Sequence, residues 1–136
     1  MNVLIILQGP AYGDEHSYNG PRLAGSLAKR DDVALRIFCF GDAVTCAARG
    51  QNAPNGYYHL DRMIELAAHH GADVGLCGTC MAARGIADEM VVSSARRSSL
   101  DEVTDWVFGR TRPSPSRPRT QCWRPSRRAR RLRGTS

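Results

Sequence analysis

The stretch DVGLCGTCMAARG, residues 73–85, decides the fold class of this chain. It opens with a short, mostly apolar run, which is typical of a strand covered on both faces of a parallel sheet. Glycines then flank two cysteines, and Thr79 and Gly85 can begin and end a short helix. The stretch therefore predicts a buried strand that runs directly into a helix, with Cys77 and Cys80 at the junction.

Two other apolar runs, residues 3–7 (VLIIL) and 33–40 (VALRIFCF), predict further buried strands. Helical patterns separate the three runs. A chain in which strands and helices alternate in this way folds as an α/β protein, here with a doubly wound parallel sheet and helices on both faces. Ligands of such sheets bind outside the carboxyl ends of the strands, so the cysteine junction lies where an active site is expected.

Three longer helices are predicted besides the short one between Thr79 and Gly85. Asn19 can cap the first, with Pro21 in its first turn. The second has apolar residues at helical spacing and ends before Gly71. Ser99 and Glu102 have the spacing of a capping box and predict the start of the third. Each helix has an apolar stripe, as a helix packed against a sheet requires.

The charge of the chain is distributed unevenly. The net charge is +6 and the isoelectric point is about 9.5. All 13 acidic residues nevertheless lie within residues 1–107, which are net negative, whereas residues 108–136 contain many arginines and no acid. A segment rich in Arg, Pro and Ser with few apolar residues cannot bury enough surface to fold. The sequence therefore predicts one α/β domain over residues 1–107 and a disordered tail over residues 108–136.

The start of the chain, MNVLIILQGP, lacks the basic segment and the long apolar stretch of a secretory signal. No run approaches the roughly 20 apolar residues that cross a bilayer. Five cysteines are an odd number, which does not suit a fully paired disulfide framework. These features predict a soluble cytoplasmic protein with reduced thiols and no membrane contact.

Cys77 and Cys80 are the candidate catalytic residues. A cysteine between a strand and a helix N-terminus lies near the positive end of the helix dipole, which favours the thiolate. Arg84 would add positive potential if its side chain turned inward. We therefore expect one of the two cysteines to be nucleophilic at neutral pH. Cys39 lies within an apolar run and is expected to be a small core residue, and Cys46 is left undecided.

Three chemistries use cysteines at this spacing. Structural zinc needs four ligands, and the neighbouring His69 and His70 would point about 100° apart on a helix, so no metal is expected. A thioredoxin-type dithiol fits a CxxC motif at a helix start, although the pattern offers no strand with a facing cis-proline. A persulfide carrier uses the same attack-and-leave chemistry as disulfide exchange. Spacing alone does not choose between the last two.

Four stretches together resemble the DsrE/DsrF/TusD family of small sulfur-relay proteins, and most closely its YchN-like branch. They are GPAYGDE, FGDAVTCAARGQNAPNGYYHLDRM, GLCGTCMAARGI and SLDEVTDWV, in the family's order over residues 1–107. The resemblance implies a flavodoxin-like subunit that assembles into homotrimers or homohexamers. It also implies a sulfur-accepting cysteine at the end of a central strand. We expect no metal or organic cofactor.

The resemblance assigns roles to single residues. Cys77 matches the cysteine that accepts sulfur, and Cys80 matches a second cysteine that only some branches have. Asp42, Gln51 and Tyr57 fall in the motif that borders the cysteine loop. The implied function is that of a sulfurtransferase-type carrier, which takes sulfane sulfur from a donor protein as a cysteine persulfide and passes it to an acceptor protein.

The end of the chain departs from the family, in which a short apolar strand usually follows the last helix. One explanation is a native basic tail that binds nucleic acid through its phosphates. The other is a slip of the reading frame in a GC-rich gene, which the abrupt change in composition favours. The final strand would then be missing or replaced, and nucleic acid would not be a partner.

A non-catalytic oligomer with a redox-sensing cysteine pair is the alternative function.

Overall fold

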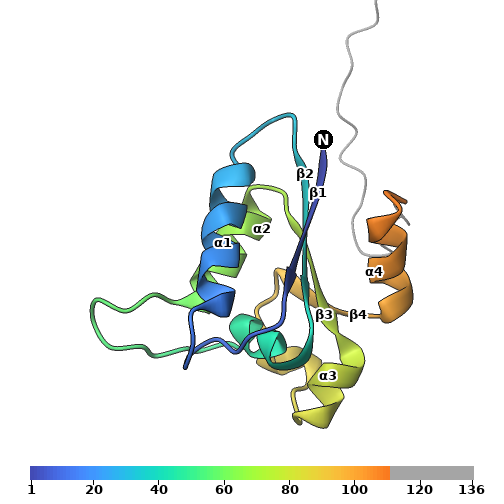
Figure 1. Cartoon of the computed structure of the whole chain (residues 1–136). Helices are drawn as coiled ribbons and strands as arrows, with labels where there is room; N and C mark the ends of the chain where they lie inside the picture. Colours follow the sequence, from blue (N-terminus) through green and yellow to red (C-terminus); the bar gives the residue numbers. More distant parts are fainter. Residues whose placement is uncertain (111–136) are drawn as a thin grey trace, which may run out of the picture.

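The fold is built on a parallel sheet. The computed structural model describes residues 1–110. Within this range four strands pair in sequence order, β1-β2-β3-β4, and every neighbouring pair is parallel (Figure 1). The strands are β1 (Asn2–Leu7), β2 (Ala34–Cys39), β3 (Asp73–Cys77) and β4 (Ala95–Ser98). The first three are the predicted strands, and all four carboxyl ends lie at the same end of the sheet.

Helices cover the two faces of the sheet unequally. The helices α1 (His16–Leu27) and α2 (Leu60–His69) lie on one face, and α4 (Leu100–Val107) lies on the other (Figure 1). The short elements are η1 (Gly41–Ala47), which follows β2, α3 (Gly78–Ala83), which follows β3, and η2 (Asp88–Met90). This arrangement confirms the predicted flavodoxin-like α/β fold with helices on both faces.

Two apolar clusters form because successive side chains of a strand point to opposite faces. Ile37 of β2 belongs to the larger cluster, which includes residues of α1 and α2. The next residue, Phe38, belongs to a smaller cluster on the α4 side, together with Cys77, Val103 and Trp106. The predicted site cysteine is therefore part of the core beneath α4.

The predicted start of the first helix at Asn19 is wrong, because α1 begins at His16. Asp14 accepts a hydrogen bond from the backbone N–H of His16 at 2.9 Å, and the Ser17 hydroxyl donates to a carbonyl of the preceding loop at 2.5 Å. These contacts stabilise a helical turn ahead of the expected cap. Pro21 consequently lies inside the helix instead of in its first turn.

The ends of the later helices follow the sequence signals more closely. Ser99 caps α4 by accepting the backbone N–H of Glu102 at 3.3 Å, which confirms the predicted start. Gly85 has a φ of +65° and follows the end of α3, as expected. The cap of α3 is Cys77 and not Thr79, because the chain turns into the helix directly at the last residue of β3.

The strand β4 has no counterpart among the predicted elements, because two of its residues are arginines. Arg96 pairs with Glu102 at 2.5 Å and with Asp73 at 3.2 Å. Arg97 pairs with Asp88 at 2.7 Å. Side chains from neighbouring elements therefore supply the partners that allow charged residues to occupy a strand.

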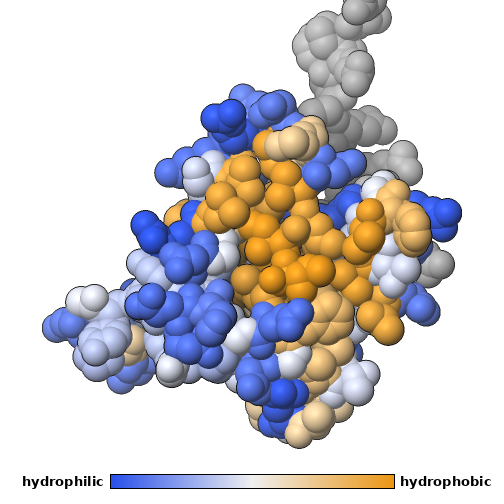
Figure 2. Space-filling view, viewed as in Figure 1, coloured by the Kyte–Doolittle hydropathy of each residue, from blue (hydrophilic) through white to orange (hydrophobic). Residues whose placement is uncertain are grey.

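In the part of the chain that the structure describes, β1 and β4 form the two edges of the sheet, and the β1 edge is apolar. Ile6 of β1 is 44% exposed, and Leu4 is half-buried. Figure 2 shows an apolar surface that extends across this edge toward α4. At the end of α4, Val107 and Phe108 are 65% and 70% exposed. The molecule thus has one large apolar area at an edge of its sheet.

Residues 108–110 complete the turn that ends α4, in which the N–H of Arg110 donates to the carbonyl of Asp105 at 2.8 Å. The rest of the predicted tail lies outside the described residues, as do its two explanations and the question of a final strand. Within residues 1–110, no helix is both long enough and apolar enough to cross a bilayer.

Candidate functional site

Cys77 is the last residue of β3 and the residue from which α3 begins. Its side chain is 8% exposed and packs in the cluster of Phe38, Val103 and Trp106. The thiol therefore lies at the carboxyl end of the sheet, with an apolar wall on the α4 side.

Cys80 lies in the first turn of α3, close to Cys77. It is more exposed than Cys77 and packs against both apolar clusters. The Cys80 thiol and the backbone N–H groups of Thr79 and Cys80 are the polar groups that act on the pKa of the Cys77 thiol. Two sulfur atoms and two amide donors thus lie near one another in the loop.

Burial raises the pKa of the Cys77 thiol above its ordinary value, and the neighbouring Cys80 thiol acts in the same direction. The N–H groups of Cys80 and Thr79 lower the pKa without outweighing these effects. A thiolate favoured by the helix dipole is therefore the wrong prediction for Cys77. The helix α3 has only 6 residues, and the charged form loses most of its hydration in this apolar position.

Arg84 and Asp42 connect α3 to η1 beside the cysteine loop. Two nitrogens of the Arg84 guanidinium, Nη2 and Nε, lie 2.7 and 2.8 Å from Oδ1 of Asp42, and Nη1 donates to the carbonyl of Cys80 at 3.0 Å. Asp42 thus neutralises the positive potential that was expected from Arg84. Because the pair is partly exposed, it contributes at most about 1 kcal/mol to stability.

Arg97 holds the other side of the loop and belongs to no recognisable motif. Its Nη1 donates to the carbonyl of Gly78 at 3.0 Å. A Cβ at Gly78 would lie 3.1 Å from Cγ of Arg97 and 3.2 Å from the carbonyl oxygen of Ser98, so this close approach favours glycine. Only a strand prediction over residues 95–98 could have placed Arg97 here.

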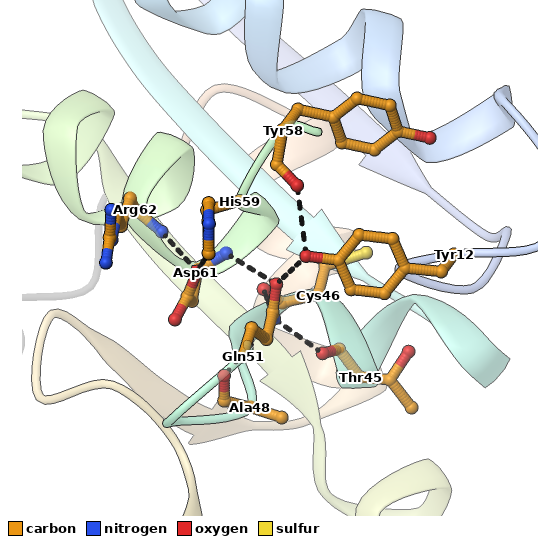
Figure 3. A network of polar contacts seen from close by, with 9 residues as sticks. All are labelled: Tyr12, Thr45, Cys46, Ala48, Gln51, Tyr58, His59, Asp61 and Arg62. Carbon is orange, nitrogen blue, oxygen red and sulfur yellow. Dashed lines mark hydrogen bonds and ion pairs between the residues drawn. The ribbon is translucent and has the colours of Figure 1, made fainter. Parts of the chain in front are cut away.

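Gln51 is the centre of a second group of polar contacts, shown in Figure 3. Its Oε1 accepts hydrogen bonds from the Tyr12 hydroxyl at 2.9 Å and from the backbone N–H of Asp61 at 3.2 Å. Its Nε2 donates to three carbonyl oxygens around the end of η1, those of Thr45, Cys46 and Ala48, at 3.3, 3.0 and 3.2 Å. One amide group thereby joins η1, the loop after β1 and the start of α2.

Tyr57 is 64% exposed and lies in the loop before α2. Together with Tyr12 and Pro54 it lines a shallow hollow of about 360 Å³. Of the four residues expected around the cysteine loop, the structure places Arg84 in contact with Cys80 and Asp42 in contact with Arg84. Gln51 and Tyr57 belong to the group around Tyr12.

Replacing Gln51 by alanine is expected to lower the free energy of unfolding by about 1–3 kcal/mol, because three carbonyl groups lose the hydrogen bond from its amide. Gln51→Glu should cost at least as much, since a carboxylate would face the same carbonyls. Urea unfolding measures both, with Asn52→Ala, an exposed neighbour, as the control. A Gln51→Ala variant as stable as the control would show that the amide contacts contribute nothing.

Cys39 and Cys46 are fully buried, each with 0% exposure. The Cys46 thiol donates a long hydrogen bond to the carbonyl of Gly9, with the sulfur and oxygen 3.9 Å apart. Cys39 is thus a core residue, as expected, and the undecided Cys46 belongs with it. Among residues 1–110, His, Cys, Asp and Glu side chains form no group of three that could hold a metal.

The buried thiols predict a loss of stability at alkaline pH. Burial raises the pKa of the Cys46 thiol from an ordinary value of 9.0 to about 11, and burial raises that of Cys39 further. Above pH 9 the unfolded chain therefore releases protons that the folded chain keeps, and stability falls as the pH rises. For Cys46 the loss reaches about 2–3 kcal/mol near its folded pKa.

Urea unfolding at pH 7.5 and 10.5 measures this effect. A Cys46→Ala variant is expected to be less stable at both values but to lose less stability between them. Equal losses in the variant and the wild type would show that Cys46 does not contribute to the pH dependence.

Comparison with known proteins places the chain among its relatives. The model of the DsrE/DsrF-like family matches residues 1–109. The chain belongs to this family. Protein YchN of Escherichia coli K12 is 33% identical over 107 residues, which are 78% of this chain and 91% of YchN. The uncharacterized protein MJ0989 of Methanocaldococcus jannaschii is 30% identical over 110 residues, which are 79% of this chain and 92% of that protein.

Solved structures agree with this assignment. The crystal structure of YchN from E. coli matches with a TM-score of 0.73 at 32% identity, over 79% of this chain and 92% of YchN. A protein of unknown function, MTH1491 of Methanobacterium thermoautotrophicum, matches with a TM-score of 0.61 at 12% identity, over 81% of this chain and 95% of that one, and supports the fold alone. Within the DsrE/DsrF-like family, the predicted relation to YchN is thus confirmed.

Proposed function

We propose that this DsrE/DsrF-like protein is a cytoplasmic sulfur carrier that accepts sulfane sulfur on Cys77 as a persulfide and passes it on. The position of Cys77 carries the proposal. Its sulfur lies at the carboxyl end of β3, where the backbone N–H groups of Thr79 and Cys80 act to lower its pKa and a second thiol lies nearby. Such donors stabilise negative charge on sulfur when the thiol ionises.

Loading begins with a proton leaving Cys77 to water. The thiolate attacks the outer sulfur of a donor persulfide, R–S–SH, and forms a new S–S bond while the donor S–S bond breaks. The donor leaves as R–S⁻, and Cys77 holds the transferred sulfur as Cys77–S–SH. One S–S bond replaces another, so the step balances without an added oxidant or cofactor. Because the pKa of Cys77 is raised, loading is expected to accelerate as the pH rises above neutrality.

Unloading repeats the same chemistry in the other direction. An acceptor thiolate attacks the outer sulfur of the persulfide, and Cys77 leaves as a thiolate. Phe38 and Trp106 wall the inner sulfur on the α4 side, which limits attack by small thiols at that atom. The donor and acceptor are separate proteins in this proposal, and the carrier is a homotrimer or homohexamer.

A redox dithiol is the second candidate, and the proximity of the Cys77 and Cys80 side chains favours it. In a carrier, the Cys80 thiolate can attack the inner sulfur of Cys77–S–SH, which releases HS⁻ and forms a 77–80 disulfide. In a redox protein, the same disulfide forms by exchange with an oxidised partner, which becomes reduced. The two functions therefore differ in whether sulfur is gained first.

Intact mass after anaerobic incubation of the reduced full chain with inorganic polysulfide tests the proposal. We expect a gain of one sulfur atom that dithiothreitol removes, and peptide mapping should locate it on Cys77. The peptides with the buried Cys39 and Cys46 serve as internal controls. A 77–80 disulfide with no prior sulfur gain would favour the redox dithiol, and a folded protein without either change would refute both.

A further inference from the structure

The two edges of the sheet differ in how they are protected against pairing with another strand. The β4 edge is only 4 residues long and contains Arg96 and Arg97, both in ion pairs. The β1 edge is 6 residues long, reads NVLIIL and has no charged side chain. Short length and charge prevent association at an edge, whereas a longer apolar strand invites it. Among the described residues 1–110, the β1 edge is therefore the one left open.

The hydrogen bonds to β2 show which backbone groups of β1 point outward. The carbonyl of Met1 accepts the N–H of Ala34 at 2.8 Å, and the carbonyl of Leu7 accepts the N–H of Phe40 at 2.9 Å. Alternate residues of a strand bond to opposite sides, so the odd-numbered residues of β1 bond to β2. The N–H and C=O groups of the even-numbered residues, Asn2, Leu4 and Ile6, face away from the sheet.

The side chains of Leu4 and Ile6 share a face with α4. Leu4 packs against the cluster of Phe38 and Trp106, and Ile6 is 44% exposed two residues further along. A hollow of about 240 Å³ separates the start of β1 from the end of α4, and Asn2, Leu4, Trp106 and Val107 are among its lining residues. The continuous apolar surface in Figure 2 covers this region.

The sequence that follows the described residues does not predict a matching strand. Arg110 is the last described residue. Its neighbour Gly109 lies close to the start of β1, because a Cβ built on Gly109 would be 3.9 Å from Nδ2 of Asn2. Residues 111–136 contain no run of apolar residues and many arginines. A second copy of the molecule, in contrast, supplies an apolar strand with unpaired edge groups in the form of its own β1.

We propose that two copies of this protein pair through their β1 strands, antiparallel about a two-fold axis at Leu4, so that the two sheets become one. In this register Asn2 lies opposite Ile6 of the partner subunit, and all outward backbone groups of these residues find partners. The partner's Ile6 then lies over the hollow between Asn2 and Val107. Each contact occurs twice, as in any isologous interface.

The β1 pairing is independent of sulfur transfer and adds a geometric condition to the proposed assembly. A two-fold contact that every subunit makes requires an even number of copies. It is therefore compatible with a homodimer or a homohexamer and incompatible with a homotrimer.

Light scattering on a size-exclusion column tests the pairing with the full chain. We expect a wild-type particle with an even number of copies and a twofold smaller particle for Ile6→Lys, because a charge on the open edge blocks pairing. Leu66→Lys is the matched control, since Leu66 is 52% exposed on α2, and it should leave the particle unchanged. A wild-type monomer or an odd number of copies would overturn the proposal, as would an unchanged particle for Ile6→Lys.

If circular dichroism shows that Ile6→Lys does not fold, amide hydrogen exchange of the wild-type protein tests the pairing instead. In the wild type, the amides of Leu4 and Ile6 should exchange more slowly as the protein concentration rises. Exchange at these amides that is fast at every concentration would show that the β1 edge stays open. That result would leave a strand from a different protein as the occupant and overturn pairing between copies.

Discussion

Replacing Cys77 by serine is expected to reduce sulfur loading to background. A hydroxyl does not ionise in the accessible pH range and cannot form a persulfide, so no other property of the site compensates for its loss. Loading is measured by intact mass after treatment with inorganic polysulfide. Because the side chain is 8% exposed among apolar groups, the hydroxyl should also cost about 1–2 kcal/mol of stability, and circular dichroism must show that the variant is folded.

Cys80→Ser is the matched control, with the same change three residues along the chain. It should still gain sulfur on Cys77, and it should hold that sulfur longer, because the thiolate that would release HS⁻ is absent. It should form no 77–80 disulfide. If Cys77→Ser instead gained sulfur on Cys80, the roles of the two cysteines would be reversed.

Truncating Trp106 is expected to produce the largest loss of stability among single substitutions on the α4 face. Its ring is 5% exposed and meets Phe38 edge-on, with 6.0 Å between ring centroids. The guanidinium carbons of Arg36 and Arg96 lie 5.7 and 5.8 Å from the centroid of the Trp106 ring. Trp106→Ala should lower the free energy of unfolding by about 3–5 kcal/mol, as measured by urea denaturation.

The same substitution should also expose the site. Trp106 and Cys77 belong to one apolar cluster, so a cavity in place of the indole ring opens the α4 side of the thiol. Alkylation of Cys77 by iodoacetamide under native conditions should be faster in Trp106→Ala than in the wild type. Trp106→Phe keeps a ring in the cluster and should cost less than half as much stability. A Trp106→Ala variant within about 1 kcal/mol of the wild type would show that α4 is only loosely held.

The sequence predicted the parts of the fold that depend on local patterns. The runs at 3–7, 33–40 and 73–77 are strands because they are short, apolar and bounded by turn residues. The strand β4 was not predicted, because its two arginines pair with acidic residues of other elements. A local sequence pattern does not show which distant residues will pair with them. The start of α1 was misplaced for a similar reason, since Asp14 and Ser17 fix it through contacts with the preceding loop.

For the candidate site, too, the sequence predicted some properties and not others. The location of Cys77 follows from the strand-to-helix junction, which the local pattern of residues 73–85 predicts. The raised pKa of Cys77 could not be predicted from this local pattern. The apolar side chains around the thiol come from Phe38 on β2 and Trp106 on α4, which are distant from Cys77 in the sequence. The glycine at position 75 is consistent with this packing, because a Cβ there would lie 3.0 Å from Cδ2 of Phe38 and 3.1 Å from Cη2 of Trp106.

The order of the strands has a consequence for synthesis on the ribosome. Each new strand pairs with the one made just before it, so the sheet can grow from β1 to β4 as the chain emerges. The helix α4 is the last described element to appear, and it supplies Val103 and Trp106 to the wall beside Cys77. A nascent chain that has released β3 but not α4 therefore exposes, on that side, the thiol that the finished protein covers. Cys77 is thus synthesised before Val103 and Trp106, which cover it in the folded protein.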